Sequence, residues 1–199
     1  LDDEARKLRF PYVEADRDYS VLLRAGLASA DGKALGKDDT RKVNTGPVAP
    51  AVGFASQGSV LPARDTRGLP VVSVNVPEVD VEFLRVRERA LPAFLAEYQR
   101  SGRRSYWSLD ELSRHAEPVY ANRFALESRP NERTLSYIPV RDLDQLREPG
   151  LYFAVLKRPG TYASQYDTAM FFVSDIGLHV RAYGNRMLVH VASLESGRP

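Results

Sequence analysis

Short apolar runs separated by turn residues recur along the chain and are most regular in its last third. Residues 151–156 and 169–173 are nearly continuous apolar runs bounded by Pro-Gly and Ser-Asp pairs. Runs of this length between turn residues are typical of strands buried in the core of a β-sandwich. A fresh strand pattern begins at Ile176, turns at 183–185 and continues over 187–194. The pattern therefore predicts one sandwich followed directly by the hairpin of another.

Residues 175–199 contain only the two strands of this last hairpin, whose apolar content lies mainly in Leu188, Val189 and Val191. Two strands do not form an independent domain in water. We therefore expect 175–199 to be the first strands of a further domain, and the chain to be a piece of a longer protein. Its start at Leu1 rather than at a methionine agrees with this expectation.

Residues 1–46 show three strand patterns and one turn signal that contains a glycine. The strand patterns cover 7–10, 19–25 and 40–45, and the turn signal covers 29–32. Three strands are too few for a two-sheet core, so they predict the C-terminal part of a small immunoglobulin-like β domain. The proline-containing segment 46–50 follows and is expected to be a linker, because proline stiffens the chain and removes backbone donors.

The central part of the chain predicts a β-sandwich over 47–174. Its strand patterns cover 52–55, 71–76, 79–86, 119–126 and 134–140. The positions that share a face are Val72, Val74 and Val76 in the second run, and Val79, Val81 and Phe83 in the third. From Leu84 onward the alternation of the third run becomes unclear.

Helical periodicity interrupts these strands at about 88–116. One helix face is formed at the spacing i, i+3, i+4 and i+7 by Leu91, Phe94, Leu95 and Tyr98. A Ser-x-x-Glu capping box begins at Ser108 and predicts a second short helix over 109–115. Leucines at both ends of 143–146 are spaced for one further helical turn. The sandwich is therefore expected to carry a short helical insertion.

Composition and charge narrow the function only slightly. The 28 basic and 26 acidic residues are spread along the chain and leave a net charge of +2, which gives no support for nucleic-acid or membrane binding. The absence of cysteine removes disulfides, thiolate nucleophiles and cysteine-ligated metal sites. No apolar run approaches the length of a membrane-spanning helix, and no signal peptide is recognisable.

Three histidines are the first residues to consider for chemistry: His115, His179 and His190. His179 and His190 would face each other across the last hairpin and would offer two ligands to a metal ion. No third ligand has suitable spacing, and a surface or structural role is the favoured interpretation. His115 falls at the end of a predicted helix.

Two pairs of carboxylates and one basic run complete the candidates. Asp110 with Glu111, and Asp142 with Asp144, are candidate acid/base pairs, but each lies near a predicted helix N-terminus, where carboxylates stabilise the helix dipole. The run 100–107 mixes arginines with Tyr106 and Trp107 and would suit a phosphate or a single nucleic-acid strand. A solvated loop with Trp107 tucked onto the core is favoured. Nucleophile, phosphate-loop and dinucleotide motifs are missing.

Several short motifs, taken in order, resemble the N-terminal region of bacterial alpha-2-macroglobulins. They are Ala-Ser-Gln-Gly-Ser-Val-Leu-Pro-Ala at 55–63, Gly-Leu-Pro-Val at 68–71, Val-Asp-Val-Glu-Phe-Leu-Arg-Val at 79–86, Pro-Gly-Leu-Tyr at 149–152, Val-Ser-Asp-Ile-Gly-Leu at 173–178 and Ser-Leu-Glu-Ser-Gly-Arg-Pro at 193–199. The resemblance covers nearly the whole chain and is weakest before Pro47. It implies macroglobulin-like sandwiches at 47–174 and from 175 onward.

The resemblance also implies a function for a longer parent protein. In the family, a protease cleaves a bait segment, and a conformational change then entraps the enzyme; in many members a Cys-x-Glu-Gln thioester captures it covalently. Neither bait nor thioester can be placed on this chain, so it is expected to be a structural and interaction region. The expected location is the periplasm of a Gram-negative bacterium, with inner-membrane association through the parent.

From this we expect a non-enzyme whose partners, through the parent, are proteases and other envelope proteins. We expect no cofactor, no nucleic acid and no membrane contact from this chain, and we assign no catalytic, cofactor-binding or metal-binding residue. An envelope scaffold, or an adhesin or glycan-binding β-module without protease trapping, is the main alternative. An unrecognised hydrolase is a further alternative, and it would require a concave site with a perturbed acid/base pair.

Overall fold

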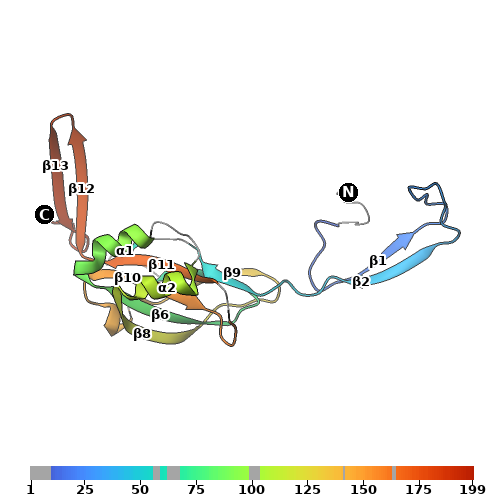
Figure 1. The fold of residues 1–199 in the computed structure, drawn as a ribbon, viewed down its shortest axis with the longest axis horizontal. Helices are drawn as coiled ribbons and strands as arrows, with labels where there is room; N and C mark the ends of the chain where they lie inside the picture. Colours follow the sequence, from blue (N-terminus) through green and yellow to red (C-terminus); the bar gives the residue numbers. More distant parts are fainter. Residues whose placement is uncertain (1–9, 56–58, 62–67, 99–103, 141, 163–164) are drawn as a thin grey trace. The chain divides into compact units, whose positions relative to one another are not determined.

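A computed structural model describes residues 10–55, 59–61, 68–98, 104–140, 142–162 and 165–199 (Figure 1). The chain divides into two compact units, 1–49 with 130–132 and 50–129 with 133–199. The structure is mainly β and consists of several antiparallel sheets, which confirms the predicted fold class. Within the described residues, no helix has the length and apolar character needed to cross a bilayer.

The first unit contains one antiparallel hairpin. Strand β1 (Asp18–Leu23) pairs with β2 (Asp39–Asn44), close to the ranges predicted from sequence. The predicted turn is present, because Gly32 has a φ of +79° and donates its N–H to the Ser29 carbonyl at 2.9 Å. The strand predicted over 7–10 lies outside the described residues except for Phe10, which is not in a strand. The assignment of 1–46 to an incomplete domain stays a prediction.

The second unit contains a six-stranded sheet and a three-stranded sheet. The larger has the order β4-β11-β10-β6-β8, with β7 also pairing β11, and the smaller has the order β3-β5-β9. The bounds of the strands are β3 Ala51–Phe54, β4 Ser59–Leu61, β5 Leu69–Val74, β6 Glu78–Val86, β7 Arg104–Ser105, β8 Ala116–Ala125, β9 Arg133–Ile138, β10 Gly150–Lys157 and β11 Gln165–Val173. All pairs are antiparallel except β4 with β11.

One core lies between the two sheets. The larger sheet contributes Val79, Val81 and Phe83 from β6 and Tyr152, Ala154 and Leu156 from β10, and the smaller contributes Leu69, Val71 and Ile138. The ring of Phe83 makes edge-on contacts with Phe124 and Phe171, with ring centroids 6.3 and 6.2 Å apart. The packing of two sheets over one apolar core makes this part of the chain a sandwich.

A second core lies on the opposite face of the larger sheet, beneath two short helices. Helices α1 (Leu91–Tyr98) and α2 (Tyr106–Ser113) lie over β10 and β11 (Figure 1). Their apolar side chains, Phe94, Leu109 and Leu112, pack against Leu84, Val86, Leu151, Phe153 and Val155. Six consecutive residues of β10, 151–156, are therefore buried, as their continuous apolar run predicted. The 3₁₀ turns Glu88–Ala90 and Asp144–Leu146 complete the described helical segments.

The second core explains why the alternation in β6 becomes unclear. Val79, Val81 and Phe83 face the first core, whereas Leu84 and Val86 face the helices. The facing strand skips Val119 between the partners of Phe83 and Leu84, which is a β-bulge. Both faces of β6 are covered at this end, so a simple pattern of alternating polar and apolar residues is lost.

The alternating valines of β5 predicted a strand correctly, but the face that they share is not the one that lies against the core. Leu69, Val71 and Ser73 are buried, whereas Val72 and Val74 are only half-buried. Ser73 is accepted on the core face because its hydroxyl lies 3.1 Å from that of Thr134 on the neighbouring strand. Apolar side chains on both faces of a strand leave no polar face to identify the solvent side.

The predicted start of the second helix is wrong. Helix α2 begins at Tyr106, and its N-cap is Ser105, whose side-chain oxygen accepts the N–H of Ser108 at 3.3 Å. Ser108, the predicted cap, therefore lies inside the first turn. The sequence contains two serines one turn apart, and the end of β7 at Ser105 decides between them.

Ser105→Ala is expected to destabilise the second unit by about 1 kcal/mol, because the N–H of Ser108 loses its acceptor. The matched change Ser108→Ala is expected to have an effect below about 0.5 kcal/mol, since alanine is favoured within a helix. Urea unfolding followed by circular dichroism measures both. A larger loss for Ser108→Ala would show that the helix begins where the capping box predicted.

Candidate functional site

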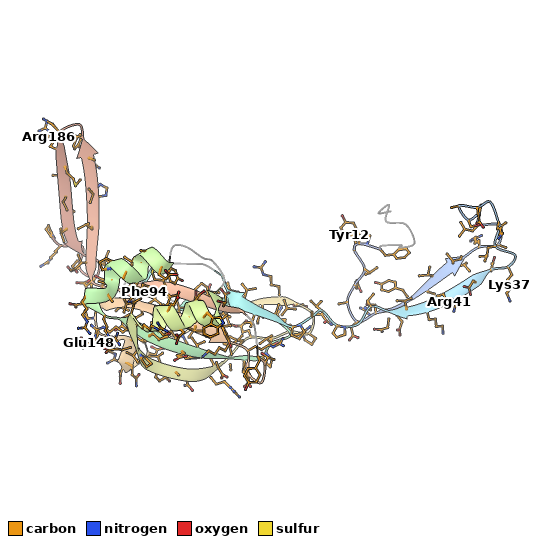
Figure 2. All side chains as sticks on the ribbon, viewed as in Figure 1. Tyr12, Lys37, Arg41, Phe94, Glu148 and Arg186 are labelled. Atoms are coloured by element: carbon orange, nitrogen blue, oxygen red, sulfur yellow. The ribbon has the colours of Figure 1, made fainter. Side chains whose placement is uncertain are left out.

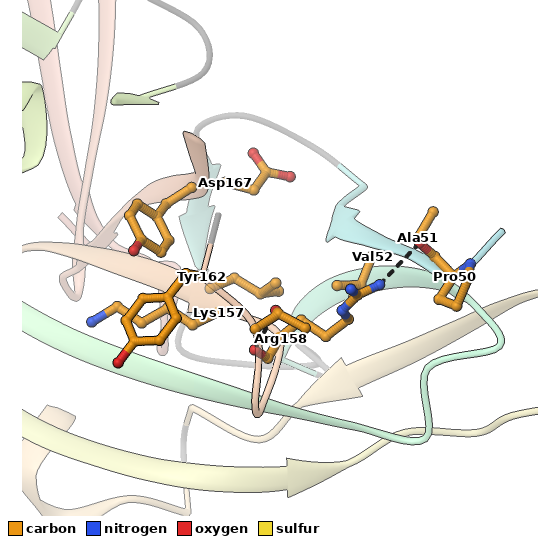
Figure 3. Close-up of a pocket in the computed structure, with 10 residues that line it drawn as sticks. Pro50, Ala51, Val52, Lys157, Arg158, Tyr162 and Asp167 are labelled. Carbon is orange, nitrogen blue, oxygen red and sulfur yellow. Dashed lines mark hydrogen bonds between the residues drawn. The ribbon is translucent and has the colours of Figure 1, made fainter. Parts of the chain in front are cut away.

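A pocket of about 280 Å³ lies where the edge strand β3 passes the ends of β10 and β11 (Figure 3). Backbone and side chains from three segments form its walls. It is lined by Pro50, Ala51, Val52, Leu156, Lys157, Arg158, Thr161, Tyr162, Tyr166 and Asp167. The pocket thus combines a strand edge, two cationic side chains and two tyrosines.

Asp167 connects the two sheets beside this pocket. Its Oδ2 accepts the backbone N–H of Phe54 on β3 at 2.8 Å, and its Oδ1 accepts the N–H of Thr168 at 3.1 Å. Gly53 allows this approach, because a Cβ atom at that position would collide with Asp167 Oδ2. Both carboxylate oxygens therefore serve the backbone, and Asp167 is a structural link between β3 and β11.

The cations of the pocket differ in how they are bound. Lys157 Nζ lies 2.9 Å from Glu82 Oε2 and 5.9 Å from the centroid of the Tyr166 ring. Arg158 is exposed, and its Nη1 donates to the Pro50 carbonyl oxygen at 3.3 Å. Lys157 is thus paired with a carboxylate, whereas Arg158 has no carboxylate partner in the described structure.

Charged pairs cross strands β6 and β8 on the outer surface of the larger sheet. Arg123 on β8 contacts Asp80 at 2.7 Å and Glu78 at 3.2 Å. The hydrogen bond from Arg123 holds the pKa of the Asp80 carboxyl below its ordinary value. Because the Asp80 pKa is lower in the folded chain, this pairing stabilises the fold above the unfolded pKa of aspartate, and the stabilisation is lost as the pH falls through the folded pKa.

Arg123→Gln is expected to raise the pKa of Asp80 toward its ordinary value, because the charged hydrogen-bond donor is removed. An NMR titration of the Asp80 carboxyl between about pH 2 and pH 6 would detect this change. Arg133→Gln is the matched control, since Arg133 is exposed and has no carboxylate partner within the described residues. An unchanged Asp80 pKa in Arg123→Gln would contradict the assigned cause.

The two C-terminal histidines are placed opposite each other, as the sequence indicated. His179 on β12 (Ile176–Tyr183) pairs in register with His190 on β13 (Arg186–Ser193). The His179 Nε2 atom accepts a hydrogen bond from Arg181 Nε at 3.1 Å. Within the described residues, no group of three or more His, Cys, Asp or Glu side chains is arranged to hold a metal ion. His115, half-buried, directly precedes β8.

The remaining candidates are not brought together. Asp110 pairs with Arg114 at 2.8 Å and, with Glu111, lies in the second turn of α2 rather than at its N-terminus, which corrects the prediction. Asp144 pairs with Arg147 at 2.9 Å, and Asp142 is exposed. Asp110 and Asp144 are thus each engaged by an arginine on their own segment.

The basic run 100–107 also differs from its prediction. Trp107 is 77% exposed on α2 and is not tucked onto the core. Leu109 and Leu112 form the buried face of α2 instead, so Trp107 points to another side of the helix. Residues 100–103 lie outside the described residues.

The C-terminal hairpin has one apolar face and one polar face. In register, the apolar face carries Ile176, Leu178, Val180, Ala182, Met187, Val189 and Val191. The polar face carries His179, Arg181, Tyr183, Arg186, Leu188 and His190, with Arg186 labelled at the hairpin tip in Figure 2. All of these side chains are exposed. An apolar face of this kind is typical of strands that pack against a further sheet.

Sequence reasoning missed the residues that shape the pocket. Asp167 is the one acidic residue in an otherwise apolar or neutral strand pattern over 165–173, and Gly53 interrupts a short strand. A glycine within a strand often marks the close approach of another group. These two signals were visible, but nothing in the local pattern linked positions more than a hundred residues apart.

Comparison with known proteins identifies the family. The model of the bacterial alpha-2-macroglobulin MG2 domain matches residues 53–171. An alpha-2-macroglobulin of Xylella fastidiosa is 57% identical over 206 residues, covering 100% of this chain and 13% of the relative. An alpha-2-macroglobulin of Escherichia coli is 35% identical over 197 residues, covering 99% of this chain and 12% of the relative. The chain therefore spans about an eighth of the length of these relatives.

Solved structures agree with this match. A crystal structure of native E. coli alpha-2-macroglobulin spanning domains MG0-NIE-MG1 has a TM-score of 0.68 at 34% identity, covering 94% of this chain and 59% of that chain. A Salmonella alpha-2-macroglobulin reacted with methylamine has a TM-score of 0.71 at 30% identity, covering 91% and 10%. On the family model, the full-length sequence relatives and these structures, the chain belongs to the bacterial alpha-2-macroglobulin family.

Proposed function

We propose that this chain is a structural and interaction region near the N-terminus of a periplasmic protein that inhibits endopeptidases by entrapment. The observation that supports this most is the 57% identity to an alpha-2-macroglobulin over the whole chain. Because the chain spans only 13% of that relative, trapping would be an activity of the longer protein. The direct partners of the parent would be proteases, in the periplasm of a Gram-negative bacterium.

The fold suits a frame rather than a catalyst. The sandwich has apolar cores on both faces of its larger sheet, which makes it a rigid body. The candidate acid/base residues Asp110 and Asp144 are paired with arginines at 2.8 and 2.9 Å. We propose that the chain performs no chemistry itself and positions other parts of the parent.

The C-terminal hairpin supports the same proposal. Its apolar face is exposed along both strands, and an isolated two-stranded sheet is marginally stable in water. We propose that 175–199 forms the first strands of a further macroglobulin-like domain, whose other strands cover this face. The hairpin would then lead directly from the central sandwich into the next domain of the frame.

The full-length parent is the protein on which to test trapping. After incubation with trypsin, we expect activity on a small peptide substrate to persist while activity on a large protein substrate is lost, because entrapment excludes substrates by size. The 199-residue chain alone serves as the control and is expected to leave both activities unchanged. Full activity on both substrates with the parent would overturn the proposal for this protease and favour an envelope scaffold.

A further inference from the structure

We propose that the pocket beside β3 binds an extended, acidic peptide segment of a partner protein by adding it to the free edge of this strand. The proposal is independent of protease trapping, because it concerns a surface of the central sandwich itself. It is built from the β3 backbone, the exposed guanidinium of Arg158 and two tyrosines, which all line this pocket; Figure 3 labels Val52, Arg158 and Tyr162 around it.

Among the residues that the structure describes, no hydrogen-bond partner occupies the edge of β3 at Val52. Strand β3 pairs on one side with β5, and Ala55 N donates to the Pro70 carbonyl at 2.9 Å, so alternate residues of the strand face β5. The N–H of Phe54 points to the other side, where Asp167 accepts it. In an antiparallel ladder, residues two apart point the same way. The N–H and C=O of Val52 therefore face the pocket. They lie next to the Asp167 carboxylate, which already accepts the N–H of Phe54.

Open strand edges pair readily with other extended chains. The Asp167 carboxylate limits this pairing at one end, because it occupies the Phe54 N–H. At the other end the Pro50 carbonyl is occupied by Arg158 at a long 3.3 Å. Between these two, the single residue Val52 offers one donor and one acceptor, which is what one residue of an added strand requires.

The charge at the pocket selects an acidic segment. The Asp167 oxygens are used by two backbone N–H groups, and Lys157 is paired with Glu82. The guanidinium of Arg158 is exposed at the mouth of the pocket and, within the described residues, has a carbonyl but no carboxylate partner. A carboxylate is the group that a guanidinium binds best, through two parallel hydrogen bonds. The added peptide would pair one residue with Val52, and a glutamate next to that residue could reach Arg158. This contact would not disturb the backbone hydrogen bonds between the peptide and Val52.

The tyrosines supply the remaining contact surface. Tyr162 is fully exposed, and Tyr166 is half-buried beneath the Lys157 ammonium. Tyrosine combines a large apolar ring with a polar hydroxyl, and such rings are common where proteins bind peptides. A pocket of about 280 Å³ accommodates one or two side chains of the added segment.

The test uses the ¹⁵N-labelled 199-residue chain and the probe acetyl-Thr-Val-Glu-Val-Thr-amide, with the same peptide carrying glutamine in place of glutamate. In ¹H–¹⁵N correlation spectra we expect the acidic peptide to shift the Val52 amide and the Arg158 Nε signal. Arg158→Gln is expected to weaken this binding about tenfold, because a neutral amide replaces the guanidinium and its charge-assisted hydrogen bonds to the carboxylate are lost. The glutamine peptide is expected to bind about tenfold more weakly to the unaltered chain, and equally to both chains.

Two controls make the result decisive. Arg186→Gln removes an exposed arginine from the hairpin and is expected to leave binding unchanged. Val52→Pro removes the edge N–H, and since this N–H points away from β5 the ladder is kept; binding should be lost while the circular dichroism spectrum is retained. Val52→Pro tests the backbone contact at the strand edge. Arg158→Gln tests the charge separately, at an exposed position where a substitution is expected to leave the fold intact.

Three outcomes would overturn the proposal. The first is no shift at Val52 with either peptide up to millimolar concentration. The second is binding that Arg158→Gln and the glutamine peptide leave unaltered. The third is a shift at Val52 caused by the neutral sugar cellotriose but not by the peptides, which would make the pocket a carbohydrate site. Failure of protease trapping by the parent would leave all of these measurements unaffected.

Discussion

Replacing Gly68 with alanine is expected to destabilise the central sandwich by at least about 3 kcal/mol, from backbone strain and steric overlap together. Gly68 has a φ of +113°, a region that residues with a Cβ atom rarely adopt. An added Cβ would also collide with the Ile138 carbonyl oxygen and lie 2.7 Å from the carbonyl carbon. Ile138 pairs with Leu69 at the start of β5, so neither strand can move without disturbing the first core.

Gly160→Ala separates these two causes. Gly160 also has a positive φ, of +68°, but a Cβ there would meet nothing within 4 Å. Its replacement is expected to lose only about 1 kcal/mol, the cost of the left-handed conformation. Urea unfolding of both variants, followed by circular dichroism, gives the comparison. Equal losses at the two glycines would show that backbone strain alone matters and that β5 and β9 can separate to admit a methyl group.

The elements predicted best are those in which the apolar positions along the sequence correspond directly to the faces that are buried. The run 151–156 is apolar at every position and became a strand with both faces buried. The spacing of Leu91, Phe94 and Tyr98 predicted α1, whose observed bounds are Leu91–Tyr98. In both cases the local sequence and the packing agree, so the period of the apolar residues was enough.

The elements predicted worst are those whose buried face or bounds are decided by the strand or helix that packs beside them. Strand β5 has apolar side chains on both faces, and only the pairing with β9 shows that Val71 and Ser73 face the core. Strands β4 and β7 were not predicted, since three and two residues are too few to show a period. Trp107 was expected to be tucked onto the core beside a solvated loop. It lies instead on the short helix α2, whose one face toward the sheet is occupied by Leu109 and Leu112.

The pocket was the least predictable feature. Asp167 and Phe54 are 113 positions apart in sequence, and their contact exists only because the edge of one sheet lies over the end of a strand from the other. Arg158 had no motif around it, and its significance comes from its exposed guanidinium having no carboxylate partner within the described residues. Sequence patterns report burial along an element, whereas a site at the meeting of two sheets depends on tertiary packing.

Phe94→Ala is expected to destabilise the sandwich by about 3–5 kcal/mol, the usual loss for a fully buried phenylalanine. Phe94 is 0% exposed, and its ring lies 5.2 Å from that of Phe153 on β10 and 5.5 Å from that of Tyr98. Figure 2 labels Phe94 where α1 meets the sheet. Because Phe153 belongs to the central strand, a cavity at Phe94 removes contacts from the sheet and not from the helix alone.

Thermal unfolding distinguishes a helical insertion that is part of the core from one that folds separately. If α1 is part of the core, thermal unfolding of Phe94→Ala shifts to lower temperature as one transition for strands and helices together. If the insertion folds separately, the helices melt early and the strands keep the transition of the unaltered chain, which would contradict the second core described above. Tyr162→Ala, at a fully exposed aromatic in the same unit, is the matched control and is expected to change stability by less than about 0.5 kcal/mol. A loss of stability for Phe94→Ala several times larger than for Tyr162→Ala would therefore establish that the helices and β10 stabilise each other. Strand β10 contributes to both cores.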